Sequence, residues 1–278
     1  MKILITGGNG NIAKMIKNNL STDYDIVNPS RNELNILNMN EIECFLNKEH
    51  YDVLIHTAIS GGRRTKEDNG DVTHNNLLMF ENLLYFSDHF KMILNFDSGA
   101  IYDRSTDIFN RKEEDLFTIP LDYYGFSKYV IYKRSLQYDN LYNFRIFNIF
   151  HANEEDSRFI KSCFLSKINN TPITIFEDKY FDFVYEDDFI CILKYYVDNY
   201  QNPEKLKKTI NICYEEKFKL SDIAKMIMQT NDETKIQILN DKLEHNYSGN
   251  GSKLQQMNIS VLGLKESLKL YEKCLSQI

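Results

Sequence analysis

The stretch KILITGGNGNIA (residues 2–13) carries the strongest fold signal in the chain. An apolar run of strand length leads through a glycine-rich turn into residues with apolar side chains at helical spacing. Gly7 allows the tight turn, and Gly10 lets the backbone approach a pyrophosphate. The helix that follows begins near Asn11 and Ile12, and its first N–H groups can donate to the phosphates. We therefore predict a dinucleotide-binding turn at this point.

The rest of the chain alternates short apolar runs with longer amphipathic stretches, which is typical of a parallel α/β sheet. We expect strands at 2–6, 24–28, 53–56, 92–96 and 142–147, and helices at 12–20, 40–47, 72–87 and 123–138. Residues 103–120 are polar and read as irregular. Later, strands are expected at 173–176, 181–185 and 209–213, and helices at 187–199, 220–229 and 264–275. The prediction is a Rossmann doubly wound parallel sheet over residues 1–150, with segments around 182–213 returning to it. A smaller mixed α/β substrate domain is expected over 151–278.

Composition narrows the choice of partners. The net charge of −7 argues against a nucleic-acid or anionic-membrane partner. The sequence has no apolar run of about 18 residues, so no membrane span is expected. The 5 cysteines are scattered and the 6 histidines show no metal-binding spacing, so we expect reduced thiols, no metal and a cytoplasmic location.

The end of the second predicted strand bears on the choice of dinucleotide. An acidic side chain there would bind the ribose 2′-hydroxyl of NAD. This strand instead runs into Asn28, Pro29, Ser30 and Arg31. Ser30 and Arg31 could bind a 2′-phosphate, which favours NADP(H), although Arg31 could also be an ordinary surface residue.

Three side chains suggest the chemistry. Tyr124 and Lys128 lie four residues apart and share one face of a predicted helix. An ammonium beside a phenol stabilises the phenolate and makes the phenol a better proton donor near neutral pH. Ser98 follows the fourth predicted strand, where doubly wound sheets bind ligands, and could donate to a substrate carbonyl. Each residue alone could be an ordinary surface residue, but the ordered set predicts carbonyl reduction.

Several segments in chain order resemble motifs of one family. They are TGGNG (6–10), RNELNI (31–36), HTA (56–58), Asn76 with NLL (82–84), DSGAIY (97–102), PLDYYGFSK (120–128), RIFNIF (145–150) and DFVYEDD (182–188). The chain resembles extended short-chain dehydrogenase/reductases that act on nucleotide sugars, above all GDP-fucose synthase and the NDP-4-keto-6-deoxysugar reductases. The motif around residues 97–102 is S-S-x-x-[VI]-Y in that family, and its Ser is catalytic.

The resemblance implies roles for further residues. It makes Ser98, Tyr124 and Lys128 catalytic and places Asn148 on the substrate side. The implied cofactor contacts are Gly7, Gly10, Asn11, Ile12, Arg31, Asn35, Ile36, Thr57, Ala58, Asn76, Tyr124 and Lys128.

Departures from the family pattern narrow the reaction. Gly99 and Ala100 follow Ser98, where related dehydratases carry an acid, which argues against dehydration. Ala100 and Arg158 stand where GDP-fucose synthase has its epimerising Cys and His, and neither can act as a carbon acid or base near neutral pH. Phe181 replaces the Arg that usually meets the substrate phosphates, so Arg158, Lys161 or Lys179 could take its place.

The hypothesis from sequence is an NADPH-dependent reductase of a nucleotide-linked 4-ketosugar in bacterial surface-polysaccharide biosynthesis. The alternatives are an NAD-dependent nucleotide-sugar 4-epimerase and a non-catalytic NADP-binding regulatory protein. We also expect a homodimer formed through the predicted helices 72–87 and 123–138. The residues that could serve this interface, or equally an internal core, are Leu77, Leu78, Leu84, Val130 and Ile131.

Overall fold

The computed structural model describes residues 1–63, 66–230, 232–240 and 245–275. The chain divides into two compact units. Unit 1 comprises Met1–Asp103, Leu116–Arg145 and Leu193–Ile210, and unit 2 comprises Arg104–Asp115, Ile146–Ile192 and Asn211–Ile278. Residues 104–115, which the sequence placed with the first domain, thus belong to unit 2.

Unit 1 is built on a six-stranded sheet with the order β10-β6-β4-β3-β1-β2. Its strands are β1 (Lys2–Thr6), β2 (Asp25–Val27), β3 (Val53–His56), β4 (Met92–Ser98), β6 (Leu141–Ile146) and β10 (Thr209–Ile212). The pairings of β1 with β2, β1 with β3, and β3 with β4 are parallel. Every residue of β3 and β4 is buried, which explains why both strands are mainly apolar. The predicted α/β fold with a doubly wound sheet is confirmed.

The strand order places a topological switch point between β1 and β3. The chain passes from β1 to β2 on one side, whereas β4, β6 and β10 are added in turn on the other side of β3. The connections that leave the carboxyl ends of β1 and β3 therefore diverge, and such a crevice is where open α/β sheets bind ligands.

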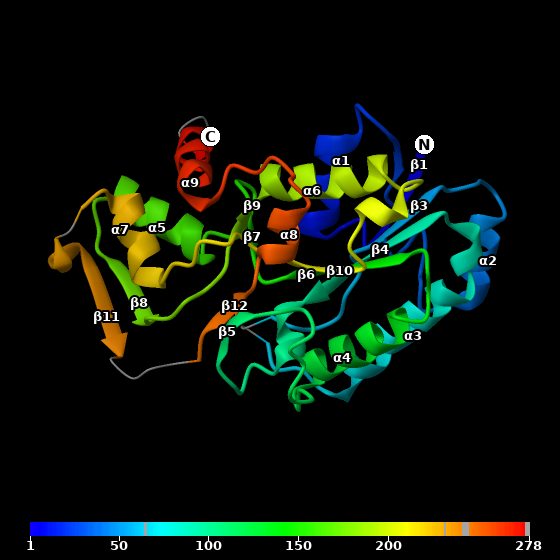
Figure 1. Ribbon diagram of the computed structural model, residues 1–278, viewed down its shortest axis with the longest axis horizontal. Coiled ribbons are helices and arrows are strands. Elements are labelled where there is room, and N and C mark those ends of the chain that lie inside the picture. Colours follow the sequence, from blue (N-terminus) through cyan, green and yellow to red (C-terminus); the bar gives the residue numbers. More distant parts are fainter. Residues whose placement is uncertain (64–65, 231, 241–244, 276–278) are drawn as a thin grey trace. The chain divides into compact units, whose positions relative to one another are not determined.

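Helices cover both faces of this sheet. The helices that carry unit 1 residues are α1 (Asn11–Leu20), α2 (Met39–Leu46), α3 (Gly70–Tyr85), α4 (Tyr123–Ser135) and the second half of α6 (Glu186–Asp198). Short 3-10 turns lie at Ser87–His89 (η1), Gly99–Tyr102 (η2) and Pro203–Lys205 (η3). Figure 1 shows α1 and α6 on one side of the sheet and α3 and α4 on the other. An ion pair between Lys194 and Asp23 joins α6 to the turn after α1.

Some of the residues expected at a dimer interface are instead part of the core between the sheet, α2, α3 and α4. Leu84 and Ile131 are 2% and 3% exposed and belong to this core, and Leu77 packs against it. They therefore serve the internal core, the second of the two possibilities that the sequence left open. Leu78 and Val130 are half-buried.

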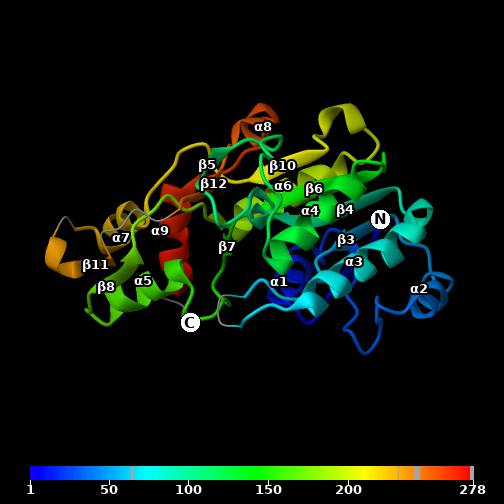
Figure 2. The ribbon, with the colours of Figure 1, turned by 90° about the horizontal axis from the view of Figure 1, so that it is seen from below.

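The described residues of unit 2 form three small parallel sheets. They pair β5 (Ile108–Arg111) with β12 (Tyr247–Gly249), β7 (Ile149–Phe150) with β9 (Val184–Tyr185), and β8 (Ile173–Glu177) with β11 (Ile236–Asn240). The helices of the unit include α5 (Phe159–Ile168), α7 (Leu220–Met228), α8 (Ser252–Gln256) and α9 (Leu264–Leu275), and η4 spans Glu233–Lys235. In Figure 2, α5 and α7 lie against β8 and β11.

Several described elements of unit 2 were not expected, namely β5, β7, β11, β12, α5, α8 and η4. Strand β5 lies in the segment predicted to be irregular, because its partner β12 is far away along the chain and local sequence does not reveal the pairing. Helix α5 was also missed, since its apolar residues do not form one clear stripe. In the described part of the chain, every helix is too short or too polar to cross a membrane.

Candidate active site

The predicted dinucleotide turn lies at the switch point of the sheet. Gly7 has φ +75°, and a Cβ atom on it would lie 2.9 Å from the Cα of Ala58 in the loop after β3. Only glycine fits there without strain or displacement. The Gly10 amide donates to the Gly7 carbonyl at 2.8 Å and begins α1. No side chain caps this helix and its first turn holds no acid, so the N–H groups at Asn11 and Ile12 suit an anionic group.

Gly8 is a further position that the sequence analysis did not single out. A Cβ atom on it would lie 2.4 Å from the Asn28 carbonyl oxygen. The Gly8 amide also donates to the Pro29 carbonyl at 3.0 Å. Gly8 therefore holds the turn against the end of β2.

The loop after β3 is fastened to the end of β1. The Thr57 hydroxyl donates to the Thr6 carbonyl at 2.7 Å, and the Ala58 amide donates to the Thr6 hydroxyl at 3.4 Å. His56 Nδ1 lies 2.9 Å from the same hydroxyl. Burial, and then the positive charge of Lys128, lowers the pKa of His56 to about 3, so its imidazole is neutral. The structure thus brings Thr57 and Ala58 beside Gly7, as predicted for one cofactor site.

The region after β2 contains an acid, Glu33, to which the sequence analysis assigned no role. The Glu33 carboxylate accepts the Ser30 amide at 2.7 Å, and hydrogen bonds from Ser30 lower the pKa of Glu33. Arg31 is exposed, and no ion pair to it is found among the described residues. One cationic and one anionic side chain therefore flank Ser30.

Two of the predicted cofactor residues here are structural. Asn35 accepts from the Leu37 amide at 3.3 Å through Oδ1, and its own amide donates to Glu41 at 3.1 Å. The Ile36 side chain is 6% exposed in the core of unit 1, and its carbonyl accepts from Asn82 at 3.0 Å. Both stabilise the loop before α2.

Asn76 also has a structural place. Its side chain is buried, accepts the Ser60 amide at 2.8 Å and donates to the Ser60 carbonyl at 3.0 Å. It further donates to the Ser127 hydroxyl at 3.1 Å, which in turn donates to the Tyr124 carbonyl at 2.7 Å. Asn76 therefore links the loop after β3 to the first turn of α4, and we propose that it acts on the site through this link.

Ser98 ends β4 and caps η2. Its hydroxyl accepts the Ala100 amide at 3.2 Å, and the residue is 8% exposed. Helix α4 packs directly on this turn because Gly125 has no side chain, and a Cβ atom there would lie 2.9 Å from the Ala100 carbonyl oxygen. The structure therefore brings the Ser98 turn and the Tyr124 segment together within unit 1.

Tyr124 and Lys128 lie on the first turns of α4. Asp122 caps this helix by accepting the Gly125 amide at 2.8 Å. The Lys128 Nζ atom is 5.9 Å from the centre of the Tyr124 ring and donates to the Phe96 carbonyl at 2.5 Å. Burial lowers the pKa of Lys128 to about 8, and the negative charge of Asp97 opposes this effect. The phenol, the ammonium and the Ser98 turn form the candidate catalytic group.

Unit 2 brings two of the predicted substrate residues into contact. Arg158 donates to the Asn148 side-chain oxygen at 2.8 Å. Lys179 is half-buried in the same unit, in the loop after β8. Phe181, which stands at the position of the missing Arg, packs in tilted arrangements against Phe183 and Tyr247 at ring-centre distances of 4.9 and 5.2 Å.

Glu154 is a residue of this region that the sequence analysis missed. Its Oε2 atom lies 3.6 Å from the Arg158 guanidinium, and its residue is 6% exposed. Its Oε1 atom is buried without a hydrogen-bond partner in the described part of the chain. Burial raises the pKa of Glu154 to about 7. The spacing of four residues from Arg158 is the signal that could have identified it.

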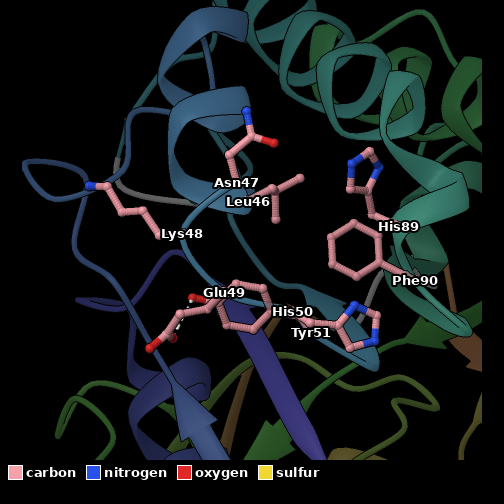
Figure 3. A pocket seen from close by; sticks show the side chains of 8 residues that line it. All are labelled: Leu46, Asn47, Lys48, Glu49, His50, Tyr51, His89 and Phe90. Carbon is pink, nitrogen blue, oxygen red and sulfur yellow. Dashed lines mark hydrogen bonds between the residues drawn. The ribbon is translucent and has the colours of Figure 1, made fainter.

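A cavity of about 340 Å³ lies elsewhere in unit 1 (Figure 3). Its lining is Leu46, Asn47, Lys48, Glu49, His50, Tyr51, His89 and Phe90. These residues precede β3 and β4 and so lie at the amino ends of parallel strands, opposite the cofactor turn. Glu49 is paired with Lys2 at 2.6 Å, which gives it a structural role. The described residues hold no cluster of His, Cys, Asp and Glu fit for a metal ion.

Comparison with known proteins places this fold and site in a class of enzymes. The family model described as "NAD dependent epimerase/dehydratase family" matches residues 3–213, and the chain belongs to that family. This confirms the resemblance to extended short-chain dehydrogenase/reductases.

Individual relatives are more distant. The chain is 31% identical over 112 residues to GDP-L-colitose synthase of Yersinia pseudotuberculosis, and the match spans 38% of this chain and only 36% of that protein. It is similar in structure to a dTDP-4-dehydrorhamnose reductase of Clostridium acetobutylicum (TM-score 0.81, 19% identity, 99% and 100% of the two chains). It is also similar to a GDP-mannoheptose C4 reductase of Campylobacter jejuni solved with NADP bound (TM-score 0.78, 17% identity, 100% and 98%). At these identities the structural likeness establishes the fold.

Proposed function

We propose that this protein is an NADPH-dependent reductase that converts the C4 carbonyl of a nucleotide-linked 4-ketosugar into an alcohol. The observation that carries the proposal is the meeting of the Ser98 turn with Tyr124 and the buried Lys128 in unit 1. These residues share the carboxyl edge of the sheet with the glycine turn. Reductases of nucleotide-linked sugars with the same fold support the choice of substrate class.

The residues present fit a pyridine dinucleotide phosphate. Gly7 and Gly10 leave the turn open to a pyrophosphate, and the uncapped amino end of α1 supplies donors for it. Arg31 is free to meet a 2′-phosphate, whereas Glu33 is engaged by the Ser30 amide. The bound cofactor would supply the hydride.

The chain's own residues would handle the oxygen of the substrate. Ser98 would donate a hydrogen bond to the ketone oxygen, which polarises the carbonyl. Tyr124 would deliver its hydroxyl proton to that oxygen as the C4–H bond forms. Lys128 would stabilise the phenolate that remains, and proton delivery of this kind contributes about 10²–10⁴-fold.

In unit 2, Arg158 is a candidate to contact the substrate phosphates together with Lys179, and Asn148 would orient the Arg158 side chain. Ala100 is buried behind Ser98 and offers no acid for an elimination or epimerisation. We therefore propose reduction without epimerisation.

The direct test is Tyr124→Phe assayed by NADPH oxidation with GDP-, CDP-, UDP- and dTDP-4-ketosugars. We expect kcat to fall at least ~100-fold with little change in NADPH affinity. Tyr123→Phe is the matched control, because Tyr123 is the neighbouring residue and is 49% exposed. If Tyr124→Phe had the same kcat as the wild type, Tyr124 would not be the proton donor.

The same assays separate the alternatives. Purified protein that retains NAD(H) and interconverts sugar epimers without added reductant would establish a 4-epimerase. A protein that binds NADPH but does not oxidise it, whichever ketosugar is added, would favour a regulatory role.

We also propose a homodimer through the outer side of α3 and α4. Tyr85 on α3 and Phe126 on α4 are 73% and 39% exposed, and Leu78 and Val130 are half-buried. Tyr85→Glu should halve the mass measured by light scattering, and an unchanged mass would refute this interface.

A further inference from the structure

A buried ion pair lies next to Ser98. Arg145 on β6 donates through Nε to Asp97 Oδ2 at 2.8 Å, and both side chains are fully buried. Burying two charges costs several kcal/mol for each ion, and an apolar pair of similar size is often at least as stable. In the family motif that this segment resembles, a Ser stands where this chain has Asp97. Stability alone therefore does not explain the buried pair of Arg145 and Asp97, and we looked for a role in the site.

The guanidinium fastens both ends of the Ser98 turn. Arg145 binds Asp97, the residue before Ser98, and donates through a terminal nitrogen to the Tyr102 hydroxyl at 2.7 Å. It is held between the rings of Tyr102 and Tyr132, at 4.8 and 4.7 Å from their centres. Asp97 precedes η2 and Tyr102 is its last residue, so one side chain on β6 sets the place of this turn.

The carboxylate also acts on Lys128. The Lys128 ammonium donates to the carbonyl of Phe96, the residue before Asp97. Asp97 Oδ1 is buried and has no hydrogen-bond partner in the described part of the chain. The negative charge of Asp97 favours the ammonium, which burial alone would disfavour.

Other groups around Lys128 do not replace this carboxylate. His56 on β3 is neutral, since its own pKa is lowered by burial and by Lys128. Arg145 on β6 is a second cation. The phenols Tyr124 and Tyr132 lie on α4, and Tyr102 lies on η2. Helix α4 also carries Tyr123, Tyr129, Lys133 and Arg134. The titratable residues of α3, which packs against α4, are exposed, namely Asp71, His74, Glu81 and Tyr85.

We propose that Asp97 is a positioning residue, whose buried carboxylate, held by Arg145, fixes the Ser98 turn and keeps Lys128 as an ammonium beside Tyr124. The consequence for catalysis rests on the proposed ketoreductase function, whereas the effect on Lys128 does not. Asp97 touches neither substrate nor cofactor in this proposal and acts through its neighbours.

The test is a titration of the lysine side chains of the full-length protein by nitrogen-15 NMR. The Lys128 signal is identified by its loss in Lys128→Met. Asp97→Asn keeps the shape and an oxygen acceptor for Arg145 but removes the charge. We expect the Lys128 midpoint to fall by about one pH unit or more in this variant. Asp52→Asn is the matched control, because Asp52 pairs with Lys91 at 2.6 Å, and it should leave the Lys128 midpoint unchanged.

An unchanged Lys128 midpoint in Asp97→Asn would overturn the proposal. If that variant does not fold, the wild-type titration still decides, because a buried lysine without a counter-ion titrates near ~5–6. A wild-type midpoint in that range would equally overturn it. Neither measurement requires a sugar substrate, so both remain valid if the proposed reductase function fails.

With an active substrate, a second measurement tests the link to catalysis. The pH at which kcat declines on the alkaline side should fall in Asp97→Asn by the same interval as the NMR midpoint. KM for NADPH should change little, because Asp97 is proposed not to contact the cofactor. A general loss of activity at every pH with no such shift would indicate a merely structural role.

Discussion

Gly62→Ala tests whether the loop after β3 sets the position of Tyr124, the proposed proton donor. Gly62 has φ +75°, and a Cβ atom on it would lie 2.8 Å from Cε2 of Tyr124 and 3.0 Å from Cδ2 and Cζ. Ordinary contact begins at 3.4 Å, so the ring or the loop must retreat by about 0.6 Å. The loop cannot move freely, because the Gly62 amide donates to both carboxylate oxygens of Asp68 at 3.0 and 3.1 Å. The Tyr124 ring is therefore expected to move.

The two effects of this substitution can be separated. An alanine in the left-handed region costs roughly 1–2 kcal/mol of stability. A misplacement of about 1 Å can cost ~10²-fold in rate, so a shift of about half that size should lower kcat by ~10-fold or more. Gly263→Ala provides the control, because Gly263 has φ +81° but a Cβ atom on it would have no neighbouring atom within 4 Å.

The assay is NADPH oxidation beside thermal unfolding of both variants. We expect both to lose similar stability, whereas only Gly62→Ala loses kcat. Full kcat in Gly62→Ala would refute the idea that this glycine positions Tyr124. An equal loss of kcat in Gly263→Ala would show that strain in the backbone is the cause.

Three further predictions concern cofactor choice, the link to α4 and pH. Arg31→Ala should lower the preference for NADPH over NADH by ~10–100-fold, as expected for loss of a hydrogen bond to a charged group. Arg134→Ala, on the surface, should leave this preference unchanged. If the ratio of kcat/KM for NADPH to kcat/KM for NADH were equal in the two variants, the role of Arg31 would be contradicted. Asn76→Ala leaves the Ser60 amide without its acceptor and should cost about 2–4 kcal/mol in urea unfolding; a cost near zero would contradict the buried network. Burial raises the pKa of Glu154 from 4.5 to about 7, so ionisation in the unfolded chain should lower wild-type stability as pH rises from 4.5 to 7. Glu154→Gln should remove about 1–3 kcal/mol of that decline. If the free energy of unfolding had the same pH dependence in the variant and the wild type, the raised pKa of Glu154 would be refuted.

Much of the fold and the centre of the candidate site could be predicted from the sequence, because both depend on local patterns. The glycine turn directly follows an apolar strand, and the spacing of four residues between Tyr124 and Lys128 is maintained by any helix. The alternation of strands and helices was sufficient to predict a doubly wound sheet. Gly7, Thr57 and Ala58 meet because parallel neighbouring strands end at one edge.

Other features depended on contacts between distant segments. Strand β5 exists because β12 pairs with it, and Asn35, Ile36 and Asn76 proved to support loops through partners that no local pattern reveals. Glu33 and Glu154 acquired their surroundings only when the chain folded around them.

The environment of Lys128 shows most clearly which properties follow from local sequence and which follow from tertiary structure. The sequence by itself determined that a lysine stands one helical turn after a tyrosine. Only the tertiary structure decided that this lysine is buried, bound to the Phe96 carbonyl and subject to the charge of the carboxylate that Arg145 holds. Burial and charge proximity are properties of three-dimensional packing, and these two quantities determine whether the ammonium persists at neutral pH.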